Sequence, residues 1–319
     1  DNATIAEASG VATFTATLSA VSALDVTVNL ALSGTATGSG TDYTASGSSI
    51  LITAGNTTGA ITVTADQDLL DENDETVIVD IDSVTNGTES GVQQQTTTIT
   101  DDDDAPTVTL SLDNANIAEA SGVATFTATL SAVSALDVTV NLALSGTATG
   151  SGTDYTASGT SILITAGNTT GTITVTADQD LLDENDETVI VDIDSVTNGT
   201  ESGVQQQTTT ITDDDDAPTV TLSVDNANIA EASGVATFTA TLSAVSALDV
   251  TVNLALSGTA TGSGTDYTAS GASILITAGN TTGNITVTAV QDALDETGET
   301  VVVDIDSVTN GTESGVQQQ

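Results

Sequence analysis

Apolar and polar residues alternate along short segments of this chain. In residues 123–130, alanine, phenylalanine and leucine occupy every second position, and valine or threonine occupies the positions between them. A period of two places the apolar side chains of an extended segment on one face, which is typical of a strand with one buried and one solvent-facing side. The same alternation, rich in β-branched residues, recurs in residues 107–112, 137–144, 161–165, 172–177, 188–194 and 208–212. The pattern predicts seven short strands joined by Gly, Asn, Ser and Asp turns, and no helix of note.

These strands belong to a unit that occurs three times. A long segment starting at Ile5 recurs unchanged from Ile117 and Ile229, and this period of 112 residues is the length of a whole domain. We expect tandem domains at residues 1–104, 105–216 and 217–319. Strands that bury one face favour antiparallel sheets packed against each other, so the predicted fold class is all-β, a tandem array of seven-stranded immunoglobulin-like sandwiches.

The two outer copies of the unit are incomplete. The first lacks the segment equivalent to 107–112. The third stops before the segments equivalent to the closing strand at 208–212 and the acidic run at 213–216. Two interpretations remain open at this point. Either the chain is an excerpt of a longer array, or neighbouring chains complete its ends.

Composition excludes several classes of function. The chain has 45 acidic residues and no Lys, Arg or His, so its formal charge is −45. Nucleic acid and anionic membranes are excluded as direct partners, because both require basic side chains. Without His, Lys or Cys we also expect no enzyme. A glycosidase with paired carboxylates is the one catalytic class left open, and three Phe and three Tyr offer it almost no aromatic platform.

The acidic residues are expected to gather at one end of each sandwich. If successive strands run up and down, the connections after the first, third, fifth and seventh strands meet at one pole. In the second copy these connections contain Glu119, Asp154, the run 178–187 and the run 213–216, whereas the connections at the other pole contain only Glu201. Such crowding is unfavourable unless a cation neutralises it, and Ca²⁺ fits flexible oxygen-rich loops better than Mg²⁺ does. The alternative is that these acids are solvated loop charges that keep the array soluble.

Three stretches in this order resemble the Calx-beta domain, the calcium-binding sandwich of sodium–calcium exchangers and of many bacterial surface proteins. They are GTATGSGTDY at 34–43, DLLDENDET at 68–76 and TITDDDD at 98–104, with counterparts in the other copies. The resemblance implies several Ca²⁺ ions per repeat, clustered at the interdomain junctions. Matched by position, the implied ligands are Glu7, Asp42, Asp68, Glu72, Glu75, Asp101, Asp102, Asp103, Glu119, Asp154, Asp180, Glu184, Glu187, Asp213, Asp214, Asp215, Glu231, Asp266, Asp292, Glu296 and Glu299.

The sequence departs from the family pattern at the start of the longest acidic loop. The family often has paired aspartates there, whereas Gln67, Gln179 and Gln291 occupy the first position of the pair. Asp66 and Asp178 are expected to compensate in the first two copies, and their counterpart Val290 in the third copy is unable to do so. The third copy also ends before its closing acidic run, so its site is expected to be the least complete.

The expected function is that of an extension rod. Calcium at the linkers would stiffen a secreted or cell-surface bacterial protein that holds an adhesive module away from the cell. The expected partners are calcium and neighbouring repeats or identical chains. An alternative is a self-assembling extracellular filament completed by strand exchange between chains. A third hypothesis, with the least support, is that outward threonines such as Thr13, Thr15 and Thr17 bind carbohydrate or ice.

Overall fold

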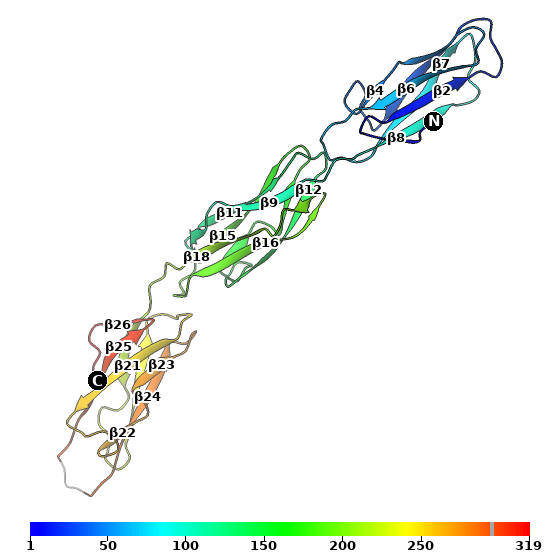
Figure 1. Cartoon of the computed structure of the whole chain (residues 1–319). Helices are drawn as coiled ribbons and strands as arrows, with labels where there is room; N and C mark the ends of the chain where they lie inside the picture. Colours follow the sequence, from blue (N-terminus) through cyan, green and yellow to red (C-terminus); the bar gives the residue numbers. More distant parts are fainter. Residues whose placement is uncertain (294–296) are drawn as a thin grey trace.

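Each repeat forms its own β-sandwich, and the three repeats follow one another in a row (Figure 1). The computed structural model describes residues 1–293 and 297–319. Within these residues every regular element is a strand, and no helix is long and apolar enough to cross a membrane. The predicted all-β fold class is therefore confirmed.

The second repeat contains each of the seven predicted strands and three shorter ones. Its strands are β9 (Thr107–Leu112), β10 (Asn116–Ala118), β11 (Val123–Leu130), β12 (Val138–Gly146), β13 (Tyr155–Ala157), β14 (Ser161–Ile164), β15 (Thr170–Ala177), β16 (Glu187–Thr197), β17 (Thr200–Glu201) and β18 (Gln206–Thr212). One sheet has the order β10-β18-β16-β12-β14, and the other has the order β13-β15-β11-β9-β17.

The chain changes sheets between β9 and β10. Strand β9 runs antiparallel to β11 in one sheet, whereas β10 runs parallel to β18 in the other. Asp113 and Asn114 lie at the crossing, and both are bonded to the neighbouring strand. The Thr125 N–H donates to Asp113 Oδ1 at 2.7 Å, and Asn114 Nδ2 donates to the Val123 carbonyl at 3.0 Å. The sandwich is thereby closed by two consecutive short strands where the sequence predicts one.

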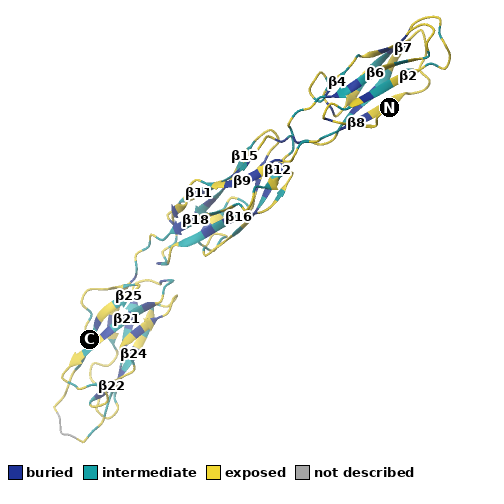
Figure 2. Ribbon diagram, viewed as in Figure 1, coloured by how far each residue is buried: buried dark blue, intermediate teal, exposed yellow. Residues whose placement is uncertain are grey.

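The core consists of the apolar positions that the alternation predicts. Phe126, Val140, Val175 and Val189 are fully buried between the two sheets. Figure 2 shows the buried residues along the strands of each repeat, while the connecting loops are mainly exposed. The loops are therefore free to hold polar side chains without disturbing the core.

The first repeat lacks a counterpart of β9. Its strands are β1 (Thr4–Ala6), β2 (Val11–Thr17), β3 (Val26–Gly34), β4 (Tyr43–Ala45), β5 (Ser49–Ile52), β6 (Thr58–Ala65), β7 (Glu75–Thr85) and β8 (Gln94–Thr100). Among the described residues, these form a sheet with the order β1-β8-β7-β3-β5 and a smaller one with the order β2-β6-β4. Strand β2 is thus an edge in the first repeat, although its counterpart β11 is central in the second.

The third repeat is incomplete in the opposite sheet. Its strands are β19 (Thr219–Val224), β20 (Val235–Leu242), β21 (Val250–Gly258), β22 (Tyr267–Ala269), β23 (Ser273–Ile276), β24 (Thr282–Ala289), β25 (Val301–Thr309) and β26 (Thr312–Glu313). Within the described part of the chain, the sheets have the orders β22-β24-β20-β19-β26 and β23-β21-β25. The second sheet therefore ends at β25 where the second repeat continues with two more strands.

Candidate metal centre

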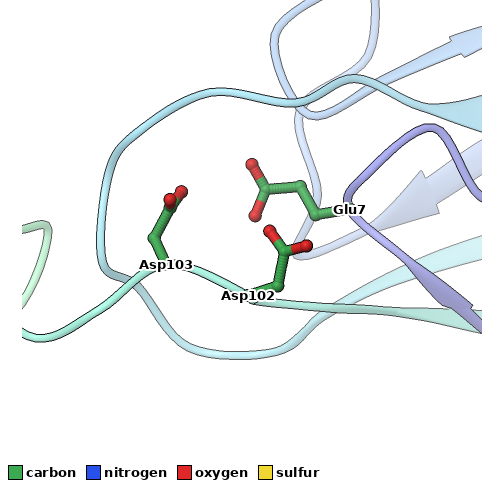
Figure 3. Close-up of side chains that lie close together, drawn as sticks. All are labelled: Glu7, Asp102 and Asp103. Carbon is green, nitrogen blue, oxygen red and sulfur yellow. The ribbon is translucent and has the colours of Figure 1, made fainter.

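The first group of acidic side chains in the first repeat lies at one end of a sheet, directly after strands β1 and β8. Strands β1 and β8 run parallel in register, so Glu7 and the run that starts at Asp101 leave the sheet at the same end. The Glu7 N–H donates to the Thr100 carbonyl at 3.0 Å, which fixes this alignment. One carboxylate oxygen each of Glu7, Asp102 and Asp103 lies within 4.8 Å of the others, and Figure 3 shows the three side chains directed into one space.

A second group combines side chains from two connections. One carboxylate oxygen each of Asp42, Glu72 and Glu75 lies within 4.8 Å of the others. Asp42 precedes β4 and accepts a short hydrogen bond from the Thr37 N–H, and its own carbonyl accepts from the Asp66 N–H at 3.0 Å. Glu75 is the first residue of β7, and Glu72 lies in the loop before it. The loop between β6 and β7 thus reaches across the pole to the connection after β3.

The backbone of this loop also joins the two groups. The Asp68 N–H donates to Glu7 Oε1 at 2.9 Å, and the Leu70 N–H donates to Asp68 Oδ1 at 2.7 Å. On the other side, the Asp101 N–H donates to Asp74 Oδ1 at 3.2 Å. The connections after the predicted first, third, fifth and seventh strands therefore meet at one end of the sandwich.

A close glycine contact shapes the connection after β3 and its counterpart after β12. Gly146 ends β12 with φ of 125°, and a Cβ there would lie 2.1 Å from the Thr188 carbonyl oxygen. Only glycine permits the loop to leave the strand so close to β16. This turn carries the chain toward Asp154, whose carboxylate accepts from the Thr149 N–H.

The second repeat has two corresponding groups. Its second group, Asp154, Glu184 and Glu187, matches that of the first repeat residue for residue. Its first group consists of Glu119, Asp180 and Asp215, so the counterpart of Asp68 takes the place of the counterpart of Asp102. The Asp180 N–H donates to Glu119 Oε1 at 2.9 Å, as Asp68 does to Glu7 in the first repeat. The arrangement thus follows from the repeated sequence.

Burial and mutual repulsion make these carboxylates hard to ionise together. Burial, followed by the nearby charge of Asp42, raises the pKa of Glu72 from 4.5 to about 7. Burial also raises the pKa of Glu75 to about 7, and a hydrogen bond with Asp42 and its charge act in the same direction. The pKa values of Glu7, Asp101 and Asp103 are raised as well, with burial as the largest cause. Ionisation of all these carboxylates together is therefore unfavourable unless a nearby positive charge compensates for it.

The chain itself supplies no side chain with that charge, because it contains no Lys, Arg or His. Several buried carboxylate oxygens also have no hydrogen-bond partner among the described residues. In the first repeat they include Glu75 Oε2, Asp101 Oδ1 and Asp103 Oδ2, and in the second Glu119 Oε2, Asp213 Oδ1 and Asp215 Oδ2. Buried carboxylate oxygens without a hydrogen-bond partner fit a hard divalent cation, and Ca²⁺ takes 6–8 oxygen ligands.

Comparison with known proteins identifies the family of these repeats. The family profile of the Calx-beta domain matches residues 1–103, 101–216 and 213–319. The chain belongs to the Calx-beta domain family. A comparison with curated proteins found no match.

Solved structures add weak similarities to these Calx-beta repeats. The crystal structure of CBD12 from CALX1.2 is 16% identical, with a TM-score of 0.29, and covers 66% of this chain and 96% of that one. The calcium-binding domain CBD12 of CALX1.1 is also 16% identical, with a TM-score of 0.28. The match covers 67% of this chain and 80% of that one. Domains 1–6 of the surface layer protein SbsC are 15% identical, with a TM-score of 0.21. The match covers 95% of this chain and 53% of that one. Such low TM-scores carry no functional information about this chain.

Several residues implied by the family resemblance lie near the groups without being members. In the first repeat, the backbone N–H groups of Asp68 and Asp101 donate to the carboxylates of Glu7 and Asp74 and so help to hold the pole together. Gln67 donates through Nε2 to Asp102 Oδ1 at 3.1 Å, so the glutamine holds a carboxylate of the pole. Asp66 accepts instead from Thr44 Oγ1 at 2.8 Å and is in neither group, so the structure does not show the expected compensation.

In the second repeat, Asp213 and Asp214 stand outside the two groups. The backbone N–H of Asp213 donates to Asp186 Oδ1 at 3.2 Å, and Asp214 Oδ1 accepts from Gln179 Nε2 at 3.1 Å. These bonds repeat those of Asp101 and Asp102 in the first repeat. The closing run is therefore anchored to the acidic loop at both junctions.

The third repeat has a looser pole. Glu231 accepts from the Asp292 N–H and from Gln291 Nε2, each at 3.1 Å, and Asp266 Oδ2 accepts from the Thr261 N–H at 2.6 Å. Glu231 and Glu299 are exposed. Among the described residues, no three acidic side chains of this repeat converge as they do in the other two, and the predicted ligand Glu296 lies outside the described residues.

Two residues at each junction were not predicted from the sequence. Ser134 Oγ, in the second repeat, donates to Asp71 Oδ2 of the first at 2.7 Å, and the Ala135 N–H donates to the Asp71 carbonyl at 2.9 Å. Both Asp71 and Ser134 are buried. Asp183 and Ser246 repeat the contact at 2.8 Å between the second and third repeats. No periodic signal marks these residues, because both lie in irregular connections.

A cavity of about 300 Å³ lies at the first of these junctions. Glu72–Glu75 of the first repeat and Ala135 and Leu136 of the second contribute to its lining. The acidic pole of one repeat therefore faces residues 131–136 of the next, which contain no acidic side chain.

Proposed function

We propose that the chain is an extension rod in which calcium, bound at the acidic poles of the first and second repeats, stiffens the junction to the next repeat. The observation that carries this proposal is the position of Asp71. It lies in the same loop as Glu72 and next to it, and it bonds to Ser134 of the following repeat. Any ion that orders this loop also orders the interdomain contact.

The closing acidic run provides a second connection. Asp101–Asp103 lead through Pro106 into β9, with three residues between the last of these aspartates and the strand. Pro106 is buried, and its carbonyl accepts from the Thr200 N–H of the second repeat at 3.0 Å. A cation bound by this run would fix one end of the linker, while the second repeat already holds the other. Little free chain would remain between the two sandwiches.

We place such a rod outside the cell, secreted or on the surface of a bacterium, where it holds a binding module at a distance. The support is chemical. Calcium is far more concentrated outside cells than in the cytosol, so the rod would stiffen only after export. Near-identical repeats suit a spacer, whose length matters more than any single surface.

Calorimetric calcium titration of the whole chain, combined with small-angle scattering before and after chelation, tests this proposal. We expect saturable binding in the affinity range of extracellular calcium modules, about 10⁻⁴ to 10⁻³ M, and a shorter, broader distribution of molecular dimensions after chelation. An unchanged scattering profile after chelation would reject the stiffening mechanism, whatever the affinity.

A filament subunit completed by strand exchange is the second candidate. Electron microscopy of the purified chain with calcium distinguishes the two, because the rod alone gives single particles and the second candidate gives end-to-end assemblies.

A further inference from the structure

The chain enters and leaves the second repeat at opposite ends. Strand β9 begins at Thr107, directly after the linker from the first repeat, and β18 ends at Thr212, before the acidic run that leads to the third. The repeats follow one another in a row, and their strands run along it (Figure 1). Tension along the row therefore pulls β9 toward the first repeat and β18 toward the third, lengthwise along both strands.

The two pulled strands are held by different sheets. Strand β9 pairs with β11 from Val108 to Leu112 and with β17 on its other side. Strand β18 pairs with β16 from Gln206 to Ile211 in the opposite sheet. Strand β10 follows β9 in the chain and pairs in parallel with β18. The β10–β18 pair therefore joins the segment that is pulled in one direction to the strand that is pulled in the other.

This pair is broken whichever end of the repeat yields first. If the N-terminal end yields, β9 leaves β11 and β17, and β10 leaves β18. If the C-terminal end yields, β18 leaves both β16 and β10. The β10–β18 pair is common to the two routes, so its strength contributes to the resistance of the repeat in either case.

Backbone hydrogen bonds extend the pair beyond both ends of β10. The Thr210 N–H donates to the Ala115 carbonyl at 2.9 Å, and the Glu119 N–H donates to the Thr212 carbonyl at 3.1 Å. Hydrogen bonds of a sheet lie across the strands, so a lengthwise pull loads them together. A pull that separates the strands from one end would load them one after another.

A buried side-chain bond strengthens the same pair. Thr209 Oγ1 donates to the Asn114 carbonyl at 2.9 Å, and Thr209 is completely buried. In the first repeat, Thr97 Oγ1 donates to the Asn2 carbonyl at 3.0 Å beside the parallel pair of β1 and β8. Because water does not reach the Thr209 side chain, its hydroxyl would lose its partner when the strands slide apart, which is unfavourable.

We propose that the chain bears tension along its length, and that the parallel pair of β10 and β18 is the clamp that resists tension in the second repeat. Bonds that must break together set a high barrier to unfolding, and forced unfolding is governed by the unfolding rate. This function goes beyond the stiffening of junctions, because a stiff junction resists bending and the clamp resists extension. The clamp consists of strand pairing within one repeat and does not require bound calcium.

Single-molecule force spectroscopy of the whole chain tests the clamp by changing the direction of pulling. The chain has no cysteine, so introduced cysteines attach the handles at chosen exposed positions. Ala105→Cys with Asp216→Cys places the handles before β9 and after β18, and the pull is lengthwise. Ala120→Cys with Asp216→Cys places both handles at the same end of β10 and β18, and the pull peels them apart. We expect the unfolding force to be about twofold higher, or more, in the lengthwise direction.

Thr209→Val tests the pair directly, because valine keeps the shape of the side chain and removes the hydroxyl. At constant lengthwise force we expect this variant to unfold about fivefold faster, the effect of one hydrogen bond that is broken before the barrier. The matched control is Thr156→Val on β13, at the edge of the opposite sheet. It removes a hydroxyl that donates to Asp178 Oδ2 at 2.8 Å and lies outside β9, β10 and β18. We expect its unfolding rate under the same force to be unchanged.

Either of two results would overturn the proposal: equal unfolding forces in the two directions, or equal unfolding rates of Thr209→Val and Thr156→Val. If Thr209→Val does not fold, as judged by circular dichroism, the comparison of directions still decides, because it keeps Thr209. All measurements are made in chelator, so they do not depend on calcium binding. Failure of the clamp therefore says nothing against calcium stiffening, and an unchanged scattering profile after chelation says nothing against the clamp.

Discussion

Glu72 and Glu75 determine how the acidic pole responds to pH. Both have a pKa near 7 in the folded chain, against 4.5 ordinarily, and Glu184 and Glu187 repeat this in the second repeat. A carboxyl group whose pKa is raised by folding stabilises the folded chain at pH values below its unfolded pKa. This contribution is lost as the pH rises through its folded pKa. Without calcium, we therefore expect the melting temperature to fall between about pH 5 and pH 8, as measured by circular dichroism in chelator.

Calcium should remove this dependence, because it binds the ionised carboxylates and competes with protons. Asp113 and Asp225 act in the opposite sense, because hydrogen bonds from backbone N–H groups lower their pKa values. Their contribution to the stability of the fold is lost only when the pH falls below the ordinary pKa of 3.8. They do not affect the comparison at higher pH. A melting temperature that rises with pH in chelator would contradict the described electrostatics.

Single carboxylates should control calcium affinity. Glu184 belongs to the second group of the second repeat, so Glu184→Gln removes one ligand charge while keeping the size of the side chain. We expect the affinity of that repeat to fall by about tenfold or more, because ligand charge sets calcium affinity over several orders of magnitude. The matched control is Asp194→Asn, which removes an exposed charge on β16 away from the groups. Calorimetry should show an unchanged titration for Asp194→Asn, and equal effects of both variants would argue against a local site.

At the residue scale, the sequence predicts which residue types gather and at which pole, because up-and-down strands fix where each connection emerges. It does not predict which carboxylate oxygens lie next to one another or which hydrogen-bond partners they have. Gln67 and Asp66 show the difficulty: adjacent side chains of an irregular loop point in different directions, and Gln67 joins the pole while Asp66 bonds to Thr44. Such choices depend on local hydrogen bonds rather than on periodicity.

At the element scale, the alternation correctly predicts all seven main strands of the second repeat. It misses β10, β13 and β17, which are too short to show a period. It also misses the change of sheet after β9, which depends on the side-chain bonds of Asp113 and Asn114. Short edge elements of this kind are set by tertiary context.

The connection between β11 and β12 has a role that its composition does not indicate. Ser134→Ala would remove the hydroxyl that bonds to the buried carboxylate of Asp71 across the junction. We expect destabilisation of the interdomain contact by about 1–3 kcal/mol, because a buried charged acceptor would lose a donor. Domain-resolved hydrogen exchange of residues 68–76 should show faster exchange in this variant.

Ser22→Ala is the matched control for this change. Ser22 has the same position in the first repeat, but its Oγ bonds to the backbone of Leu24, at 2.8 Å to the carbonyl and 3.0 Å to the N–H. We expect exchange of residues 68–76 to be unaffected by Ser22→Ala. If both variants accelerate exchange there equally, the effect comes from general loss of stability and the Asp71 contact is not a junction element.

At the scale of the whole molecule, the repeats share one orientation. Each acidic pole that precedes another repeat meets the connection between the second and third main strands of that repeat, at Asp71–Ser134 and again at Asp183–Ser246. A net charge of −45 without any basic side chain also makes repeats of neighbouring molecules repel one another. The same charge therefore keeps separate chains soluble, and it makes each junction unfavourable without a compensating cation.

Coordination and simple screening predict different responses to salt. Screening by monovalent ions weakens repulsion over a Debye length of about 8 Å at physiological ionic strength, but it supplies no ligand to the orphaned oxygens of Asp101 and Asp103. In chelator, we therefore expect added NaCl to shorten the chain slightly, as repulsion between flexibly joined repeats decreases. Calcium at far lower ionic strength should lengthen it and narrow its distribution of dimensions, because the junctions stiffen. Small-angle scattering at matched ionic strength distinguishes these outcomes. If NaCl reproduced the effect of calcium, the acidic poles would act as diffuse charge rather than as binding sites.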